Sequence, residues 1–521
     1  MTRHLPDPAS GRRVGGPQTS AAPELIASGF ALENEDAPIL HRGYNLADMA
    51  HVLDLAQRRI IPEHAQRALL KLLLEAHETD AEDFPYDAAF GEPYNSRERF
   101  FVDRIGDTAG WLHAGRPRRE AARIALRLHL RTQIAHLVRE ASRFVEETAR
   151  LSRRHVHTLM ADQTYLQKAQ PSTFGHYLLS FAQPALRDAH RLLAELAEIN
   201  ASPGGAGCVN GTRLQQDRTA LARTLGFDTV IGHTRDAMWR VDDLIAVLAI
   251  GTSMVSNQSK LAEDLEIYSS SEFNFVDLHD SYSRSSVLMP QKRNPYALSI
   301  VRGASGVLIG RLTGFLAVTK SPSARSDNFI FAYGEVPRAL DLTIRVTALM
   351  TGVVRTLHVN ADNLREELVK GYTQATDLAE HLTQIRHVDY RTAYFVVGDV
   401  VRDASRVGLR GLDLTADMLN TAAEGRTGAS WGLIDSDLQA VLDPAQIVAS
   451  RQAVGGAAPE AVERMLETTF ADATALAADA AARLSGFAAA ELDLLARATA
   501  AVNAGVDPAP AHPAPKRGGS L

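Results

Sequence analysis

The chain has 521 residues, of which 45% are apolar and 22% are charged. This is ordinary usage for a soluble globular protein of roughly two to four domains, and it excludes a wholly disordered chain, a collagen-like fibre and a membrane bundle. The net charge of −7 is mild, so the composition gives no general attraction to nucleic acid or to anionic membranes. A single cysteine, Cys208, excludes an intramolecular disulfide framework.

Both ends of the chain are predicted to be disordered extensions. Residues 1–22 and 501–521 are rich in proline and glycine and lack the periodic apolar positions of a helix or a strand. Residues 1–22 also lack the apolar run of a secretory signal, and no stretch approaches the roughly 18 uninterrupted apolar residues of a membrane span. We therefore expect a cytoplasmic protein.

The region between these ends has the pattern of long helices. Residues 118–160 contain neither glycine nor proline, and apolar residues recur there at steps of three and four, as on one face of an amphipathic helix. An unbroken helix of this length measures about 65 Å. Further long helices are predicted at Pro184–Ala201, Asp236–Ala249, Ser253–Phe273, Pro295–Thr319 and Pro337–Leu357. Because strand patterns are nearly absent, the sequence predicts an all-α fold.

Prolines and glycines mark special points along these helices. Pro295 and Pro337 are expected in the first helical turn, where proline is tolerated. One predicted helix holds four glycines, whose cost to helix stability indicates closely packed backbones. These are Gly303, Gly306, Gly310 and Gly314. The glycine-rich loop 202–207 misses the spacing of a nucleotide-binding fingerprint, so a phosphate site is not predicted there.

The most informative segment is a polar loop, residues 283–295, with the sequence SRSSVLMPQKRNP. Its residue types describe a flexible, serine-rich loop that leads through a proline into a helix. Such a loop can bring Ser286, Lys292 and Asn294 onto one small ligand, and a nearby lysine favours the deprotonated form of a serine hydroxyl. The residues alone are equally those of a solvated surface loop.

This loop is similar to the signature G-S-S-x-M-P-x-K-x-N-P of the fumarase/aspartase superfamily, and within that superfamily it most resembles the argininosuccinate lyases. Residues 105–116, 164–176 and 202–212 resemble further conserved stretches of the family, in the same order along the chain. Residues 375–379 resemble part of its carboxy-terminal domain. The resemblance therefore covers about residues 23–480.

The resemblance implies an all-α subunit of three domains. We expect a mostly helical domain at residues 23–126, a central bundle of long helices at 127–368 and a smaller helical domain at 369–500. It also implies a homotetramer whose active sites combine residues of different subunits. The expected partners are a small-molecule substrate and further copies of the chain, without a metal ion, a cofactor, nucleic acid or a membrane.

The reaction that the resemblance implies is the elimination of an amine from an N-substituted L-aspartate, which leaves fumarate. Ser286 would be the base that takes a proton from the carbon next to one carboxylate. Lys292 and Asn294 would bind this carboxylate and stabilise the negative charge that develops on it during the reaction.

Three further residues are expected at the substrate. By the same resemblance Thr164 would contact the other carboxylate, Gln167 would also bind the substrate, and Arg118 would anchor it across a subunit boundary.

The sequence departs from the family at the group that protonates the leaving amine. The family has a histidine after the threonine and a glutamate that holds it, whereas Tyr165 and Ser299 stand at these positions here. Tyr165 can donate a proton only if its pKa, ordinarily near 10, is perturbed. Two alternatives are that Tyr165 is a packed aromatic residue and that a basic amine is protonated before it leaves.

A second departure concerns the substrate clamp. Arg119 replaces an amide of the family pattern, and an additional guanidinium suits an additional carboxylate on the substrate. The alternative is a helix-surface charge that is paired with Glu120 or Glu146. Residues 325–333 keep none of the pattern that holds the guanidino group in argininosuccinate lyases, and their aromatic residues make this place more apolar. These are Phe329, Phe331 and Tyr333.

We therefore expect a carbon–nitrogen lyase that releases an amine other than arginine, with additional carboxylate on the substrate. In this respect it resembles the ethylenediamine-disuccinate lyase type, which makes aminopolycarboxylates. A genuine argininosuccinate lyase, with guanidino contacts from another segment, is one alternative. A non-catalytic structural homologue is the other.

Overall fold

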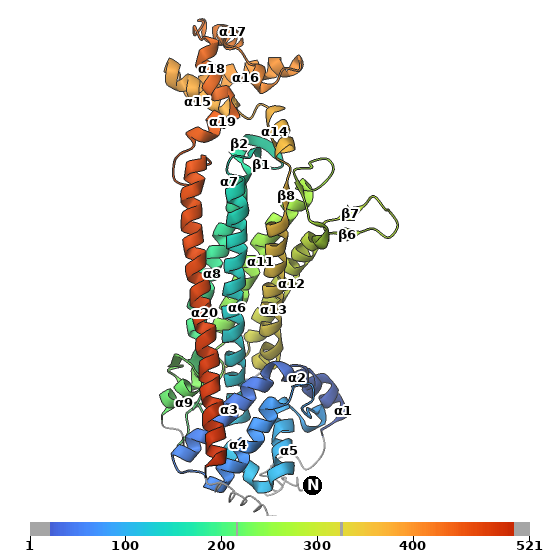
Figure 1. Ribbon diagram of the computed structural model, residues 1–521, viewed down its shortest axis with the longest axis vertical. Coiled ribbons are helices and arrows are strands. Elements are labelled where there is room, and N and C mark those ends of the chain that lie inside the picture. Colours follow the sequence, from blue (N-terminus) through green and yellow to red (C-terminus); the bar gives the residue numbers. More distant parts are fainter. Residues whose placement is uncertain (1–20, 215–216, 324–326, 505–521) are drawn as a thin grey trace, which may run out of the picture.

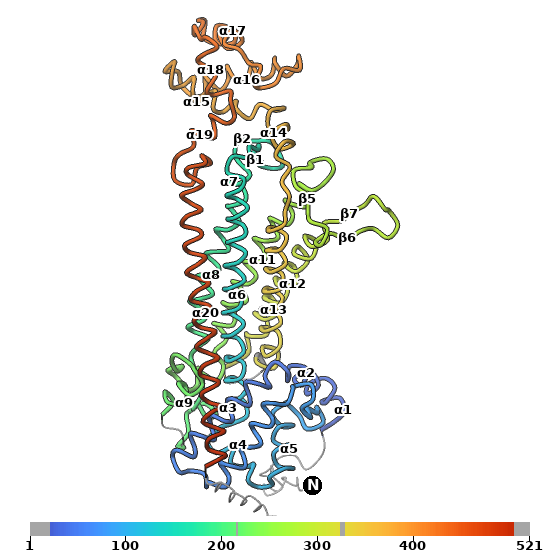
Figure 2. Tube along the Cα trace, viewed as in Figure 1, coloured from blue at the N-terminus to red at the C-terminus, as the bar shows by residue number. Residues whose placement is uncertain are grey.

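Long helices that run side by side form the body of the molecule (Figures 1 and 2). The computed structural model describes residues 21–214, 217–323 and 327–504, so that most of the two predicted tails lies outside the described residues. The structure is 71% helical, which confirms the all-α fold. The bundle consists of α6 (Arg118–Arg154), α8 (Ala182–Ile199), α11 (Asp242–Tyr268), α12 (Tyr296–Thr319), α13 (Asp327–Thr356) and α20 (Pro459–Asn503).

Helix α6 is the centre of this bundle and packs against α8, α13 and α20 along its length. The apolar stripe predicted for it is buried without exception, because residues at steps of three and four share one face of a helix. Its members are Ile134, Leu137, Ala141, Phe144, Val145, Thr148 and Leu151.

A head of shorter helices surrounds the first turns of α6, at the bottom of Figure 1. Helix α3 packs directly on α6, and their close approach requires Gly43, because a Cβ at this position would lie 2.5 Å from the Ala125 Cα. The helices of the head are α1 (Pro23–Leu25), α2 (Ala31–Glu35), α3 (Ala37–Gln57), α4 (Glu63–Glu78) and α5 (Pro93–Ile105). A π-helical turn at Ile26–Phe30 and 3-10 turns at Ala88–Phe90 and Gly106–His113 connect them.

The opposite end of the bundle carries a group of helices with an apolar core of its own (Figure 1). Helix α20 then returns the chain along the whole bundle and contacts α4 in the head. The helices at this end are α14 (Ala361–Val369), α15 (Ala375–Arg386), α16 (Tyr390–Arg406), α17 (Ala416–Thr427), α18 (Asp435–Leu442) and α19 (Pro444–Ser450), with a 3-10 turn at Gly411–Asp413. The predicted division into three domains stays a prediction, and its boundary at residue 126 falls inside the continuous helix α6.

Short strand pairs decorate the helices instead of forming a central sheet. The antiparallel pair β1 (Leu159–Thr164) and β2 (Gln167–Thr173) is a hairpin at the far end of α6. The other pairs are β3 (Ala201–Ser202) with β4 (Thr229–Val230), β5 (Val276–Asp277) with β8 (His358–Val359), and β6 (Arg284–Ser285) with β7 (Arg293–Asn294). The remaining short helices are α7 (Phe174–Leu179), α9 (Arg218–Thr224) and α10 (Thr234–Ala237), with a 3-10 turn at Asp280–Tyr282.

Four helix predictions were wrong at their boundaries. The two helices predicted at Asp236–Ala249 and Ser253–Phe273 are one continuous helix, α11, because the single glycine between them, Gly251, does not break it. The helix predicted over residues 118–160 ends at Arg154, because the chain turns there into the β1–β2 hairpin. Pro337 lies inside α13 and not in its first turn. Proline lacks the N–H that would bond to the carbonyl four residues earlier, but the helix continues through it, and the Pro337 carbonyl accepts a hydrogen bond from Gln133 Nε2 (3.2 Å).

The four glycines of α12 do not mark a close contact within the chain. A Cβ built at any of them meets no described atom within 4 Å, and all four are exposed. Much of α12 is apolar at the surface, and Val307 and Ile309 are 49% and 52% exposed. Among the described residues it is the one helix long and apolar enough to cross a membrane, and 28% of its apolar window is buried in the chain. Helices that form contacts between chains pass the same test of length and composition.

Candidate active site

Ser286 lies just beyond the short β6–β7 pair, on a hairpin that projects from the side of the bundle (Figure 1). Its backbone N–H donates to the Lys292 carbonyl (3.1 Å), which closes the loop between them. Its Oγ accepts hydrogen bonds from the backbone N–H groups of Leu288 (3.3 Å) and Met289 (3.0 Å). Two N–H dipoles aimed at one hydroxyl oxygen stabilise negative charge on it, which is what a serine base needs.

The other two signature residues lie on the same hairpin. Asn294 is fixed, because its side-chain amide donates to the Arg284 carbonyl across the strand pair (3.0 Å). Lys292 is exposed, and its ammonium group has no hydrogen bond or ion pair with another residue that the structure describes. Val287 and Leu288 at the tip are almost fully exposed. Exposed apolar side chains at the tip are unfavourable in water, so the hairpin is suited to contact a surface outside this chain.

Thr164 and Gln167 face each other across the tip of the β1–β2 hairpin, where Tyr165 and Leu166 form a two-residue turn. Both turn residues have positive φ (54° and 58°), a conformation that such a turn requires and that side chains other than glycine and asparagine disfavour. Tyr165 is 98% exposed, so it is not a packed aromatic residue within the chain. Backbone strain at an exposed tip is frequent at functional positions.

Arg118 and Arg119 begin helix α6 at the other end of the bundle. Arg118 Nη1 forms an ion pair with Glu92 Oε1 (3.3 Å), the residue that precedes α5. Arg119 is exposed, and no ion pair joins it to another described residue. The predicted alternative pairing of Arg119 is wrong, because Glu120 is buried elsewhere and Glu146 pairs with Arg150 (3.2 Å).

Buried charge fixes this start of α6 in the head. The carboxylate of Asp48 in α3 is fully buried. It accepts hydrogen bonds from Arg97 Nη2 (2.8 Å) and the Tyr94 hydroxyl (2.7 Å) and forms an ion pair with the Arg116 guanidinium. Because Arg116 lies two residues before Arg118, this network fixes the position of Arg118 and Arg119 at the start of α6. A buried carboxylate with several donors is costly to disturb, since removing it leaves two guanidinium groups without a counter-charge.

The glycine loop holds a carboxylate of its own chain. Glu120 accepts hydrogen bonds from the backbone N–H groups of Gly205 and Gly207, both at 2.7 Å, and its side chain is buried. Gly207 has φ of +60°, and a Cβ there would lie 2.6 Å from the Gly211 carbonyl oxygen, so that glycine is required. The backbone N–H groups of this loop therefore bind a carboxylate of the same chain, Glu120. This contact explains the glycines of the loop without a bound phosphate.

The aromatic residues of segment 325–333 contact α6 one turn beyond Arg119. The Arg123 guanidinium lies 4.0 Å from the centre of the Phe329 ring and donates to the Tyr333 hydroxyl (2.7 Å). Arg123 is 4% exposed. The Arg123 guanidinium thus contacts both residues, so Phe329 and Tyr333 do not form the open apolar surface that was expected. Phe331, in contrast, is exposed.

Within one chain, the predicted site residues form three separate groups. Arg118 and Arg119 begin α6, and the hairpin of Thr164 follows its end, so the 37 residues of the helix separate them by about 55 Å. The Ser286 hairpin leaves the side of the bundle at a third place (Figure 1). No substrate of the expected size spans these distances.

Sequence analysis missed two carboxylates in the head, Glu33 and Glu92, and it gave a third, Glu120, the wrong partner. Glu33 is half-buried in α2, and burial together with the negative charge of Glu92 raises the pKa of its carboxyl to about 7. Burial also raises the pKa of Glu120 to about 7, against the opposing effect of its two N–H donors. Glu120 lies 85 positions before Gly205, so no spacing links it to the glycine loop, and none links Glu33 to Arg118.

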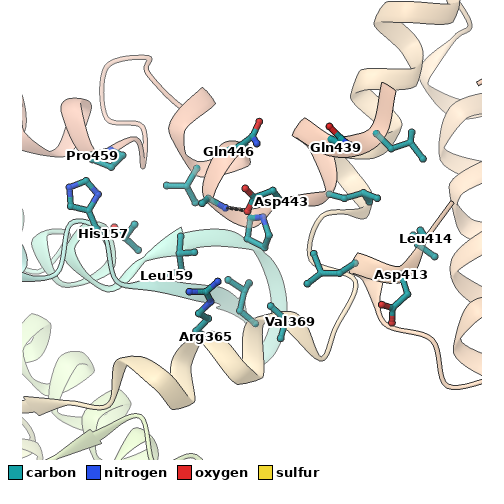
Figure 3. A pocket seen from close by; sticks show the side chains of 18 of the residues that line it. His157, Leu159, Arg365, Val369, Asp413, Leu414, Gln439, Asp443, Gln446 and Pro459 are labelled. Atoms are coloured by element: carbon teal, nitrogen blue, oxygen red, sulfur yellow. Dashed lines mark hydrogen bonds between the residues drawn. The ribbon is translucent and has the colours of Figure 1, made fainter. Parts of the chain in front are cut away.

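A cavity of about 990 Å³ lies between α14, the β1–β2 hairpin and the C-terminal helices. His157, Arg365 and Asp443 are among its lining residues (Figure 3). None of the predicted site residues lines it, and the Asp443 carboxylate is engaged in capping the N-H of Ala445 (3.0 Å). Among the described residues no group of three histidine, cysteine or acidic side chains could hold a metal ion.

Comparison with known proteins matches residues 54–310 to a lyase family and residues 372–449 to the argininosuccinate lyase C-terminal family. The argininosuccinate lyase of Methanococcoides burtonii is 32% identical over 426 residues, which cover 81% of this chain and 86% of that protein. A doubly substituted EDDS lyase variant with bound fumarate superimposes with a TM-score of 0.83 at 27% identity, over 93% of this chain and 97% of that one. EDDS lyase in complex with formate gives a TM-score of 0.82 at 27% identity, over 96% and 99%.

The sequence similarity spans most of both chains, and the structural similarity spans nearly all of them. The predicted family is therefore confirmed, and the chain belongs to the argininosuccinate lyase family of carbon–nitrogen lyases within the fumarase/aspartase superfamily.

Proposed function

We propose that this enzyme releases fumarate from an N-substituted L-aspartate whose amine part carries carboxylate and is not arginine, as in aminopolycarboxylates such as ethylenediamine-disuccinate. Ser286 removes the proton, and Lys292 and Asn294 stabilise the carboxylate that gains charge. Two backbone N–H groups on the Ser286 oxygen support its role as the base.

The observation that carries the proposed specificity is the gathering of three arginines at the start of α6. Arg119 is exposed and free of ion pairs with described residues, Arg118 has one partner in Glu92, and Arg123 is buried on an aromatic ring. An additional carboxylate on the substrate finds a cation in Arg119. A substrate guanidinium would instead add a further positive charge where the protein already places three.

Comparing two substrates tests this specificity. We expect faster initial fumarate release, followed by its ultraviolet absorbance, from ethylenediamine-disuccinate than from argininosuccinate. A clear preference for argininosuccinate would overturn the proposal. Arg119→Asn, which restores the family's amide, should lower kcat/KM for ethylenediamine-disuccinate about tenfold or more, as expected for a charge-assisted hydrogen bond. Arg143→Asn, an exposed arginine on the same helix, is the matched control.

A genuine argininosuccinate lyase is the second candidate function. It is favoured by the curated relatives, which bear that name at 30–33% identity. The same pair of substrates decides between the two candidates, because the chemical step is shared and the amine alone differs.

We further propose that the enzyme is a cytoplasmic homotetramer with composite sites. The separation of about 55 Å between Arg118 and Thr164 within one chain supports active sites that are built from more than one chain. The exposed apolar face of α12, with its four glycines, offers a surface on which helices of other copies can approach closely. The exposed, free Cys208 fits a reducing compartment.

A further inference from the structure

We propose that Glu33 is the group that exchanges a proton with the amine nitrogen of the substrate, in place of the histidine that this sequence lacks. The inference rests on the proposed function and adds a catalytic residue to it. It is drawn from where Glu33 lies and from which charged groups surround it.

Hydrogen bonds to the neighbours of Glu33 place it beside the clamp. The next residue, Asn34, donates to the carbonyls of Phe30 and Gly91, both at 2.7 Å. Gly91 immediately precedes Glu92, so α2 is tied to the residue that pairs with Arg118. The hydrogen bond from the Asn34 side chain to the Gly91 carbonyl therefore brings Glu33 and Glu92 to the same end of α6.

A second tie holds the other side of Glu33. Asp36, which precedes α3, forms an ion pair with Arg338 of α13. Helix α13 also carries Tyr333, which bonds to Arg123 of α6. The short helix α2 is thus held between α13 and the turn before α5, and Glu33 lies close enough to the start of α6 to feel the charges of Arg118 and Arg119.

The titratable and charged groups near Glu33 come from the turn before α5, from α6, from α13 and from the residue that precedes α3. They are Glu92 from the turn before α5, Arg118 and Arg119 from α6, Tyr333 from α13, and Asp36 with its partner Arg338. Glu92 is engaged by Arg118 (3.3 Å). The Glu33 side chain has no hydrogen bond or ion pair with another described residue, although charges lie close to it.

The two carboxyls therefore have different tasks. Glu92 neutralises and orients Arg118, whereas Glu33, half-buried next to a like charge, has its pKa raised to about 7 and can hold a proton near neutral pH. A pKa near the working pH is also the most effective for a group that both gives and takes a proton.

The proton balance is simple. In elimination, Ser286 takes the carbon-bound proton, the C–N bond breaks with its electron pair going to nitrogen, and the Glu33 carboxyl gives its proton to that nitrogen. Fumarate and the amine leave, Glu33 is reprotonated from water, and Ser286 loses its proton to water. In the reverse addition, the Glu33 carboxylate takes a proton from the amine nitrogen as the C–N bond to fumarate forms, and the Ser286 hydroxyl gives its proton to the carbon.

The test is the pH dependence of kcat for ethylenediamine-disuccinate cleavage between pH 5.5 and 9, in wild type, Glu33→Gln and Glu35→Gln. Since elimination needs protonated Glu33, wild-type kcat should fall as the pH rises through about 7. Glu33→Gln should lower kcat at pH 6 about 100-fold or more and remove this decline. Glu35→Gln, an exposed glutamate two residues away, should behave as wild type.

Each outcome has a definite meaning. A Glu33→Gln enzyme with wild-type kcat, or with a rise in KM alone and an unchanged pH profile, would overturn the role in proton transfer. Circular dichroism of the variant, which is nearly isosteric, excludes unfolding as the cause of a loss. If the wild type releases no fumarate from any N-substituted aspartate, it is the proposed function that fails, and the inference fails with it.

Discussion

Ser286 owes its proposed reactivity to the turn that holds it. Its Oγ accepts two backbone N–H groups, and its own N–H is bound to Lys292, so the oxygen is held in a small ring of donors before any substrate arrives. Donors that are already oriented do not have to reorganise when negative charge develops, which is the main advantage of such an arrangement.

We expect Ser286→Ala to abolish turnover and to leave the fold intact. The hydroxyl is lost, but the loop closure between the Ser286 N–H and the Lys292 carbonyl uses the backbone and remains. The rate should fall about 100- to 10,000-fold, the usual contribution of a positioned base, with an unchanged thermal midpoint. Substantial fumarate release by this variant would mean that another residue is the base.

At the scale of single residues, the sequence identified candidate segments better than it predicted how each side chain is paired. The loop of Ser286, Lys292 and Asn294 was recognised from its motif, because a motif lies within one short segment. That Arg118 is held by Glu92 could not be predicted, because the two residues are 26 positions apart and meet only through the tertiary fold of the head. The raised pKa of Glu33 has the same origin, since burial and neighbours decide it.

The glycine loop and the first turn of α6 act as one structural unit. Glu120 supplies the carboxylate that the loop surrounds, two residues after Arg118, so loop and clamp are fixed by the same pair of hydrogen bonds. We expect Glu120→Ala to lower the free energy of unfolding by about 2–4 kcal/mol, because the N–H groups of Gly205 and Gly207 lose their acceptor while buried.

Denaturant unfolding measures this change, and hydrogen exchange of residues 202–211 shows whether the loop is released. Glu146→Ala on the same helix removes a partly exposed ion pair with Arg150 and should cost less than about 1 kcal/mol. Equal losses in the two variants would show that the carboxylate does not hold the loop.

The long helices were predictable because their apolar stripes repeat over many turns, as α6 shows. The hairpin of Thr164 and Gln167 could not be predicted. A two-residue turn is normally recognised by glycine or asparagine, whereas this turn contains Tyr165 and Leu166. The start of α13 ten residues before Pro337 was missed for the opposite reason, since proline usually marks a first turn.

For the whole molecule, the separation of the site residues and the exposed face of α12 have the same explanation. A single chain keeps Arg118, Thr164 and Ser286 far apart, and it leaves an apolar helix largely uncovered. If copies pack through α12, the helix is covered and residues from different chains can meet. The proposed tetramer thus accounts for both features with one set of contacts.

Gly310→Arg tests this account. Gly310 is exposed in α12, and a Cβ there meets no described atom within 4 Å, so an isolated chain accommodates the arginine. A face covered by another copy cannot, because the side chain would separate the helices and bring an unpaired charge into the contact. We therefore expect a lower mass in light scattering at micromolar concentration, together with loss of fumarate release. Gly398→Arg, at an equally open and exposed glycine of α16, should keep the wild-type mass and activity. A Gly310→Arg protein of wild-type mass would rule out α12 as the interface, and a smaller species with full activity would show that one chain suffices for catalysis.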